Sequence, residues 1–201
     1  MKLSPIFYFL LLFVACSTPK LIESTTPITK IDTNKVYFAD GKSSFLPVRK
    51  NSNATIIYLV RHAEKAKEGG RDPLLTTEGT ERATRLKDIL MNANIEEVYS
   101  TDFKRTQLTA TPLANAVGQT IQSYNPRELK AFAEQLKSNS QGKRILIAGH
   151  SNTTPTLTNA LLGEEKFRQL TEAQYDHLFV VTIGADGVAK GMDLRLSLIH
   201  I

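Results

Sequence analysis

From residue 54 onward, apolar residues follow two alternating patterns along the chain. Short runs rich in Val, Ile, Leu and aromatic residues are typical of buried strands, as in 55–60 (TIIYLV). Longer segments between them place apolar residues three and four positions apart, which is the spacing of an amphipathic helix. The predicted strands cover 55–60, 97–100, 120–123, 144–148, 178–183 and 192–198. The predicted helices cover 78–92, 103–117 and 152–162, with a fourth that begins at Pro126 inside a capping box formed by Asn125 and Glu128.

The order of these elements predicts the fold class. Strands separated by helices favour parallel pairing, because a helical crossover returns the next strand in the same direction. The last strand, 192–198, follows a turn at Asp186-Gly187 and alternates apolar with polar residues, which predicts a half-buried strand at an edge. We therefore expect an α/β protein, a three-layer α/β/α sandwich whose mainly parallel sheet has an antiparallel edge strand, formed by residues 54–201.

Residues 1–15 have the pattern of a targeting segment, in which Lys2 precedes a run of ten apolar residues. Ten helical residues cover about half of a ~30 Å hydrocarbon core, so the run is too short to span it and a cleaved signal peptide is expected. The segment 13–16 (FVAC) resembles a bacterial lipobox, with Phe13 where Leu is usual. This resemblance implies lipidation of Cys16. An uncleaved anchor and an ordinary signal peptide are the alternatives.

Residues 16–53 differ in composition from the rest of the chain. The stretch 17–34 is rich in Ser, Thr, Pro and Lys with few large apolar side chains, which is typical of a flexible tether. Apolar residues at 36–38 and 45–46 flank Asp40-Gly41, a weak hairpin signal. We expect residues 16–53 to form a tether that contains a small hairpin.

Composition excludes a few classes of site. Cys16 is the single cysteine of 201 residues, so neither an intramolecular disulfide nor a cysteine-based zinc site can form. Lys and Arg number 25 against 20 Asp and Glu, but the basic residues are dispersed along the chain without a basic run. A solvated surface explains this excess better than a nucleic-acid interface, and no nucleic-acid partner is expected.

Basic and histidine side chains follow the predicted strands at the point where each one ends. Arg61 and His62 come directly after the first strand of the domain. Arg105 follows the second strand, and His150 follows the strand at 144–148. The carboxyl ends of parallel strands meet at one edge of an open sheet, and guanidinium and imidazole groups match phosphate oxygens, so this cluster predicts a site for a phosphate dianion. The two arginines would repel a cation, and no metal site is expected.

Four sequence motifs follow one another in this part of the chain. They are 61–65 (RHAEK), 72–79 (DPLLTTEG), 100–106 (STDFKRT) and 149–152 (GHSN). With these motifs, residues 54–183 resemble the histidine phosphatase superfamily, which has the phosphoglycerate mutase-like fold. The resemblance implies a phosphatase and does not specify a substrate.

The resemblance also implies a role for each residue of the cluster. His62 would be the nucleophile that forms a phosphohistidine, and a backbone carbonyl would hold its second ring nitrogen. Arg61, Arg105 and His150 would surround the phosphoryl group and stabilise charge on its oxygens, with no cofactor required. Asn152, the expected cap of the following helix, would lie where backbone amides can bind a phosphate oxygen of the substrate.

Many members of this superfamily carry a further Glu or Asp that protonates the leaving oxygen. Glu128 and Glu134 are the carboxylates between Arg105 and His150, and Glu64 belongs to the first motif. Glu64 and Glu128 are the proton-donor candidates, although an ion pair or a helix cap explains each of them more simply. The alternative is that no dedicated acid exists, as in the short phosphohistidine phosphatases, and this would favour good leaving groups.

These observations predict a phosphatase that hydrolyses phosphomonoesters of a small substrate through a phosphohistidine on His62. With a lipid on Cys16 it would be anchored to a membrane of the bacterial cell envelope, on the periplasmic side. Two alternatives stay open: a protein phosphohistidine phosphatase, and a non-catalytic lipoprotein that binds an anion. The sequence indicates neither the substrate nor the oligomeric state.

The lipobox resemblance generates a first prediction. Mass spectrometry of the protein purified from bacterial membranes is expected to show cleavage before Cys16 and a lipid on that cysteine. A Cys16→Ala variant is expected to lose the lipid mass and leave the membrane fraction. An uncleaved amino terminus with an unmodified Cys16 would contradict the prediction.

Overall fold

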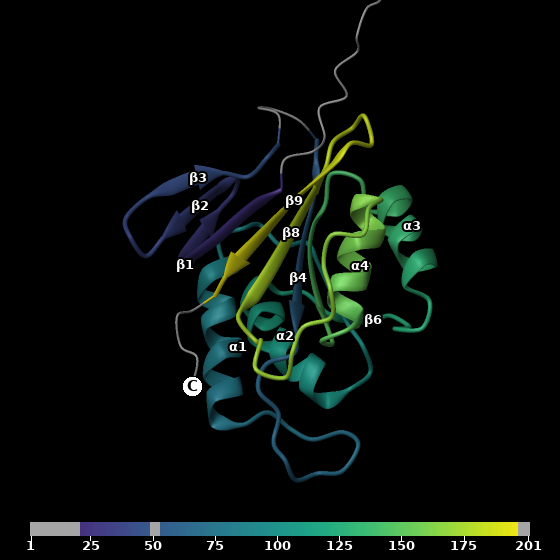
Figure 1. The fold of residues 1–201 in the computed structure, drawn as a ribbon. Coiled ribbons are helices and arrows are strands. Elements are labelled where there is room, and N and C mark those ends of the chain that lie inside the picture. Colours follow the sequence, from purple (N-terminus) through teal and green to yellow (C-terminus); the bar gives the residue numbers. More distant parts are fainter. Residues whose placement is uncertain (1–20, 49–52, 197–201) are drawn as a thin grey trace, which may run out of the picture.

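The computed structural model describes residues 21–48 and 53–196 (Figure 1). The signal peptide predicted for 1–15, Cys16 and the end of the strand predicted for 192–198 lie outside these residues. None of the helices within the described ranges is long and apolar enough to cross a membrane.

A mixed sheet forms the centre of the described structure. Its strands are β1 (Ile22–Asp32), β2 (Lys35–Phe38), β3 (Ser43–Phe45), β4 (Thr55–Arg61), β5 (Glu97–Ser100), β6 (Ile121–Ser123), β7 (Arg144–Gly149), β8 (His177–Ile183) and β9 (Ala189–Arg195). They lie in the order β3-β2-β1-β9-β8-β4-β7-β5-β6. β4, β7, β5 and β6 are parallel, whereas β8 pairs antiparallel with both β4 and β9.

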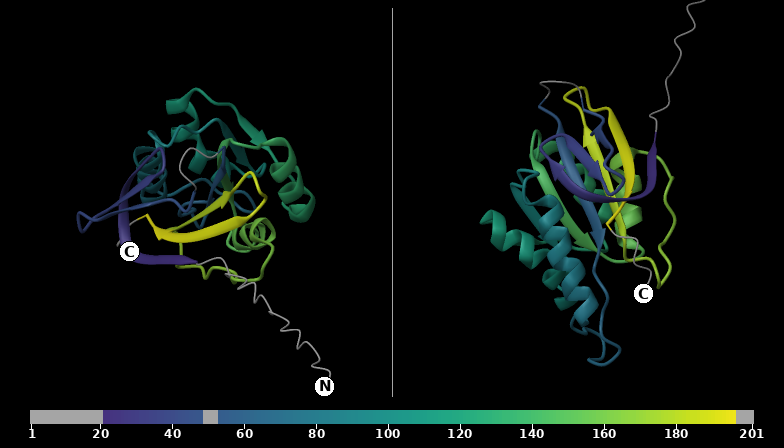
Figure 2. Two further views of the ribbon diagram at one scale, coloured as in Figure 1. Left: turned by 90° about the horizontal axis from the view of Figure 1, so that it is seen from above. Right: turned by 90° about the vertical axis from the view of Figure 1, so that its left-hand side faces the viewer.

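Helices cover both faces of this sheet, which confirms the α/β fold predicted from the sequence (Figure 2). They are α1 (Thr77–Leu90), α2 (Lys104–Val117), α3 (Leu129–Asn139) and α4 (Thr153–Leu162). α1 and α2 pack in one core cluster with Ile56, Tyr58 and Val60 of β4. The alternate residues Ile57 and Leu59 belong to a second cluster with α3 and α4. Successive strand residues point to opposite faces, and both faces of β4 are covered, which explains why residues 56–60 are all apolar.

Three helix ends are defined by a capping threonine and two glycines. Thr76 caps α1, and its Oγ1 accepts a hydrogen bond from the backbone N–H of Gly79 at 3.1 Å. Gly118 ends α2 and Gly163 ends α4, both with positive φ. Glycine adopts this left-handed conformation without the steric cost that a Cβ would add.

The capping box predicted at Asn125 is wrong. The Asn125 side chain accepts from the backbone N–H of Arg127 at 3.1 Å, which closes a turn on the amino side of the helix. α3 therefore begins at Leu129, with Glu128 at its N-cap and without a side-chain capping bond. Pro126 lies in the turn and not at the first helical position.

Residues 22–32 form a strand of the sheet, so the tether predicted for 17–34 is wrong over this range. β1 pairs parallel with β9 and antiparallel with β2, and β2 forms the expected hairpin with β3. Ile28 and Ile31 are fully buried in the core. The composition misleads because the few large apolar residues of this stretch occupy inward-facing positions of one long strand.

The added strand also corrects the position predicted for the carboxyl-terminal strand. β9 is not at the edge of the sheet, because β1 covers the side that β8 leaves open. Met192 and Leu194 are fully buried, and even Asp193 between them is 6% exposed. The alternation of apolar and polar residues in 192–198 is typical of an edge strand, but it does not show that another strand, β1, pairs with the open side of β9.

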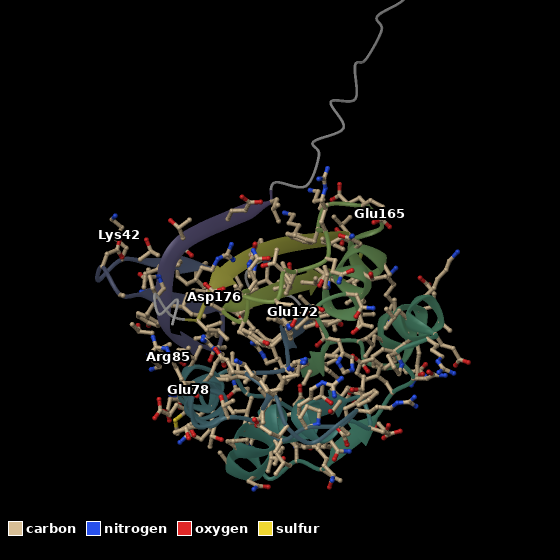
Figure 3. The ribbon with its side chains drawn as sticks, turned by 60° about the horizontal axis from the view of Figure 1, so that its bottom comes forward. Lys42, Glu78, Arg85, Glu165, Glu172 and Asp176 are labelled. Carbon is tan, nitrogen blue, oxygen red and sulfur yellow. The ribbon has the colours of Figure 1, made fainter. Side chains whose placement is uncertain are left out.

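The parallel register aligns the carboxyl ends of β4, β7 and β5. Arg61 at the end of β4 pairs with Gly149 at the end of β7, and Ser100 of β5 pairs with Ala148. The segments that follow these three strands therefore start at the same end of the sheet. This end is at the bottom of Figure 1 and comes forward in Figure 3.

The buried face of β1 generates a second prediction. Ile31→Ala is expected to lower the free energy of unfolding by about 2–5 kcal/mol, because it leaves a cavity in the core. Phe45→Ala, at a side chain 70% exposed on the neighbouring hairpin, should change it by about 0.5 kcal/mol or less. Urea denaturation of both variants measures the difference. Equal stabilities would show that these residues behave as a tether.

Candidate active site

Three chain segments meet at this end of the sheet and bring together the histidines and arginines singled out in the sequence. His62 follows β4, and its backbone N–H donates to the carbonyl oxygen of Gly149 at 2.9 Å. His150 follows β7, and its ring centroid lies 5.6 Å from that of His62. Arg105, in the first turn of α2, has its Nη2 3.4 Å from His150 Nδ1. The alignment of strand ends thus brings together three side chains that are separated by 43 and 45 positions in the sequence.

His62 is buried and held in one orientation. Its Nδ1 lies 2.8 Å from the carbonyl oxygen of Ala63. A carbonyl oxygen can only accept, so Nδ1 carries the hydrogen and Nε2 keeps a lone pair. Nε2 has no hydrogen-bond partner among the residues that the structure describes. The expectation that a nearby carbonyl holds the second nitrogen agrees with this geometry.

His150 is held by a hydroxyl chain that begins on β5. Its Nε2 lies 3.0 Å from Thr101 Oγ1, which lies 2.8 Å from Thr106 Oγ1. Because the Thr106 hydroxyl donates to the carbonyl oxygen of Phe103 at 2.7 Å, the Thr101 hydroxyl donates to Thr106 and accepts from His150. His150 Nδ1 then faces Arg105 as an acceptor.

Burial and positive neighbours keep both imidazoles neutral. Burial, followed by the charges of Arg61 and Arg105, lowers the pKa of His62 to about 3. Burial, followed by the charges of Arg105 and Arg61, lowers the pKa of His150 to about 4. At neutral pH, His62 therefore presents an unprotonated Nε2, as a nucleophile must.

Arg105 is held by the loop that connects β4 to α1. The carbonyl oxygen of Arg71 accepts from Arg105 Nη1 at 3.3 Å, and Asp72 Oδ1 lies 3.7 Å from the same atom. Asp72 Oδ1 also accepts from the backbone N–H of Lys104 at 2.9 Å, so one carboxylate caps α2 and orients its arginine. The Phe103 ring lies 4.4 Å from the guanidinium carbon of Arg105.

Arg61 is held by the segment between α4 and β8. Its Nη1 donates to the carbonyl oxygens of Thr171 at 2.7 Å and Gln174 at 3.1 Å. Its Nη2 donates to Glu172 Oε2 at 3.2 Å and lies 3.4 Å from the Tyr175 hydroxyl. The Tyr175 ring lies 4.0 Å from the Arg61 guanidinium carbon and 6.0 Å from the His62 ring.

The two guanidinium groups retain unused donors. The Nε atoms of Arg61 and Arg105 are buried without a hydrogen-bond partner, two of the five buried side-chain polar atoms of this kind in the described structure. A buried donor without an acceptor costs about 1–3 kcal/mol, more for a charged group. An anion bound between them would supply acceptors for both, and an oxyanion fits because its oxygens match the guanidinium fork.

The structure does not bring the two proton-donor candidates into the cluster. Glu64 accepts from Arg82 Nε at 2.9 Å with both carboxylate oxygens, in an ion pair on the side of α1. Glu128 is exposed at the start of α3 and lines a separate hollow with Tyr99 and Gln135. Neither contacts His62 or the arginines among the described residues.

Asn152 lies at the N-cap of α4 as predicted, but its side chain makes no capping bond. Thr153 Oγ1 accepts from the backbone N–H of His150 at 2.9 Å, which closes the turn between β7 and α4. The side chain of Asn152 is exposed beside the histidine. It is therefore free to turn toward a ligand.

Sequence reasoning missed Glu172 and Tyr175. Both contact Arg61, although they are more than 110 positions from it in the sequence. They belong to an irregular segment without a repeating pattern, so nothing in the sequence indicates where their side chains lie. Thr101 and Asp72 were present in the motifs but had no role assigned. Glu172 is 78% exposed at its side chain and is labelled near the middle of the face in Figure 3.

Metal ligands do not gather here. Within residues 21–48 and 53–196, no group of three or more His, Cys, Asp and Glu side chains is placed to hold a metal ion. The donors that converge on the cluster are guanidinium and imidazole nitrogens, a set suited to an anion.

Comparison with protein families supports this chemistry. The model of the histidine phosphatase superfamily (branch 1) matches residues 57–127. The match includes Arg61, His62 and Arg105, and it ends before His150, which the sheet register adds to the same cluster.

Solved structures described as phosphatases align with most of the chain. A mycobacterial glucosyl-3-phosphoglycerate phosphatase aligns with a TM-score of 0.60 and 13% identity, covering 72% of this chain and 100% of that one. The protein histidine phosphatase SixA, complexed with tungstate, aligns with a TM-score of 0.57 and 15% identity, covering 70% and 97%. A phosphoserine phosphatase from Entamoeba histolytica, in complex with 3-phosphoglyceric acid, aligns with a TM-score of 0.55 and 16% identity, covering 73% and 98%. No curated protein sequence matches the chain.

The ion pair on Arg61 generates a third prediction. Glu172→Gln is expected to tighten the binding of tungstate about two- to fivefold, because the carboxylate no longer competes for Arg61 Nη2. Glu78→Gln, the same charge change on an exposed residue of α1 that Figure 3 labels apart from Glu172, is the matched control. Isothermal titration calorimetry measures both. Unchanged or weaker binding in Glu172→Gln alone would contradict the prediction.

Proposed function

We propose that the protein is a phosphatase that hydrolyses phosphomonoesters through a phosphohistidine on His62. The observation that carries the proposal is the state of His62: a neutral imidazole whose Nδ1 is fixed on Ala63 while Nε2 is left without a partner beside two arginines. The match of residues 57–127 to the histidine phosphatase superfamily supports it. So do the alignments with structures described as phosphatases.

The proposed reaction has two steps. In the first, His62 Nε2 attacks phosphorus, a P–N bond forms and the bond from phosphorus to the leaving oxygen breaks. In the second, water attacks phosphorus, the P–N bond breaks, and inorganic phosphate leaves with the imidazole restored. Arg61 and Arg105 stabilise the negative charge on the phosphoryl oxygens in both steps. His150 joins them as a donor when the charge of a bound phosphate raises its pKa and Nδ1 takes up a proton.

The leaving group limits the range of substrates. Glu64 is bound by Arg82, and Glu128 lies apart from the cluster, so neither is placed to protonate a leaving oxygen. We therefore propose substrates whose leaving group departs without strong acid assistance, such as aryl or acyl phosphates. Protein phosphohistidine is the second candidate substrate, and it is favoured by the same positions of Glu64 and Glu128 away from the cluster.

We also propose that a lipid on Cys16 anchors the enzyme to a membrane of the bacterial cell envelope, facing the periplasm. Support comes from the sequence of residues 1–16. β1 starts at Ile22, six positions after Cys16, and six extended residues reach at most about 21 Å. The anchor would therefore hold the folded domain close to the bilayer, and substrates would be those available at the membrane surface.

The nucleophile generates the fourth prediction. His62→Ala is expected to abolish hydrolysis of p-nitrophenyl phosphate while tungstate still binds, because the arginines remain in place. Arg105→Ala should lower kcat/KM about 10²- to 10³-fold. Phosphate release measured under equal conditions for wild type and variants tests both expectations.

Two outcomes separate the proposals. A ³²P label that is acid-labile and base-stable in the wild type, and missing in His62→Ala, identifies a phosphohistidine enzyme. Tungstate binding without turnover in the wild type would indicate an anion-binding protein. Rates on aryl phosphate, alkyl phosphate and a phosphohistidine peptide then rank the substrate classes.

A further inference from the structure

A chain of hydrogen bonds connects the buried interior of β8 and β9 to Arg61. It starts at Asp193 on β9 and His177 on β8, which are 6% and 7% exposed. These two residues take no part in the proposed reaction. Burial of a carboxylate and an imidazole costs desolvation free energy unless hydrogen bonds compensate for it. The hydrogen-bond partners of these two residues therefore indicate what the pair stabilises.

The outer end of the chain is the turn that holds Arg61. The carbonyl oxygens of Thr171 and Gln174 both accept from Arg61 Nη1, so the two hydrogens of this nitrogen are used. The turn is closed twice: Gln174 N–H donates to Thr171 O at 3.1 Å, and Thr171 N–H donates to Gln174 Oε1 at 2.8 Å. The side chain of Gln174 therefore fixes the spacing of the two carbonyls that grip Arg61.

The inner end of the chain fixes Gln174 in turn. Since Oε1 of Gln174 accepts from Thr171, its Nε2 is the donor that faces His177 Nε2 at 3.3 Å. The imidazole then accepts at Nε2 and carries its hydrogen on Nδ1, 3.0 Å from Asp193 Oδ1. Arg195 Nη1 donates to the same carboxylate oxygen and lies 2.9 Å from His177 Nδ1. Both nitrogens carry hydrogens when Nδ1 donates to Asp193, so they do not bond each other and Asp193 Oδ1 accepts from both.

We propose that His177 is a positioning residue: with Asp193 it orients Gln174, and through the turn at 171–174 it sets the guanidinium of Arg61 in the anion pocket. This inference rests on the proposed function, because it concerns the same pocket. With Nη1 held by the turn, a phosphate would meet Arg61 at its Nε, which has no partner among the described residues, and at Nη2 in place of the Glu172 carboxylate. The turn also carries Tyr175, whose ring lies against the other side of Arg61.

The experiment removes the link without touching the pocket. Gln174→Met keeps the length of the side chain but neither closes the turn nor reaches His177. We expect tungstate binding to weaken and KM for p-nitrophenyl phosphate to rise, each roughly three- to tenfold, as for one lost hydrogen bond. Gln169→Met, at an exposed glutamine of the same segment, should leave both values as in the wild type.

A pair of substitutions at His177 separates positioning from folding. His177→Gln retains an oxygen that can accept from Gln174, whereas His177→Phe fills the space without an acceptor. At equal melting temperatures, His177→Phe should reproduce the Gln174→Met effect and His177→Gln should restore much of the binding. Wild-type tungstate affinity in a folded His177→Phe protein would overturn the proposal.

The readout that does not depend on activity is the Arg61 Nε–H group itself. In ¹⁵N-labelled protein, its exchange with water should be faster in Gln174→Met and His177→Phe than in wild type and Gln169→Met. If the wild type neither binds tungstate nor hydrolyses phosphate esters, the proposed function fails, and the exchange rates still test the link. Equal exchange rates in all four proteins would overturn the link while the phosphatase proposal stands.

Discussion

The burial of two guanidinium groups beside two imidazoles is the constraint on which the rest of this structure depends. Like charges in a low-dielectric site repel, and without an anion between them they must be offset by other groups. Arg61 is offset by four oxygens from one segment, and Arg105 by the carbonyl of Arg71 and the carboxylate of Asp72. The histidines meet the same constraint by staying neutral. Two irregular segments, 62–76 and 163–176, are therefore ordered around the arginines as much as around the core.

The same constraint shapes the chemistry that the site supports. A site that keeps both imidazoles unprotonated when empty holds a nucleophile ready on His62, and a dianion entering between the arginines would reduce their mutual repulsion. The Nε atoms of Arg61 and Arg105 make no hydrogen bond within the described residues, and Nη1 and Nη2 of Arg105 each keep one further hydrogen. Glu172 accepts from Arg61 Nη2 but is largely exposed, and solvent screening limits what that pair contributes. A substrate phosphate that binds Arg61 Nη2 would therefore displace the Glu172 carboxylate from it.

The sequence predicted the central part of the fold well and the margins poorly, for a physical reason. A strand buried on both faces, such as 55–60, and a glycine at a helix end, such as Gly163, carry signals that depend on neighbouring residues alone. The clustering of His62, Arg105 and His150 could be predicted because each residue follows a strand, and the carboxyl ends of parallel strands lie at the same edge of a sheet. Partners such as Tyr175 could not be found this way, since their position depends on the path of an irregular segment. The long strand at 22–32 escaped because its inward residues are few and its outward ones polar.

That missed strand changes how the site is supported. β1 pairs with β9, and Glu23 stands opposite Asp193 in their register. Asp193 is the inner end of the hydrogen-bond chain that runs through His177 and Gln174 to Arg61. Without β1, β9 would be an edge strand, and its carboxylate would lie beside solvent, where competition from water weakens such bonds. Residues 22–32, whose composition resembles that of a linker, therefore complete the sheet and shield Asp193 from solvent. If the chain is anchored through Cys16, the strand that receives any pull from the membrane is the one that supports this buried carboxylate.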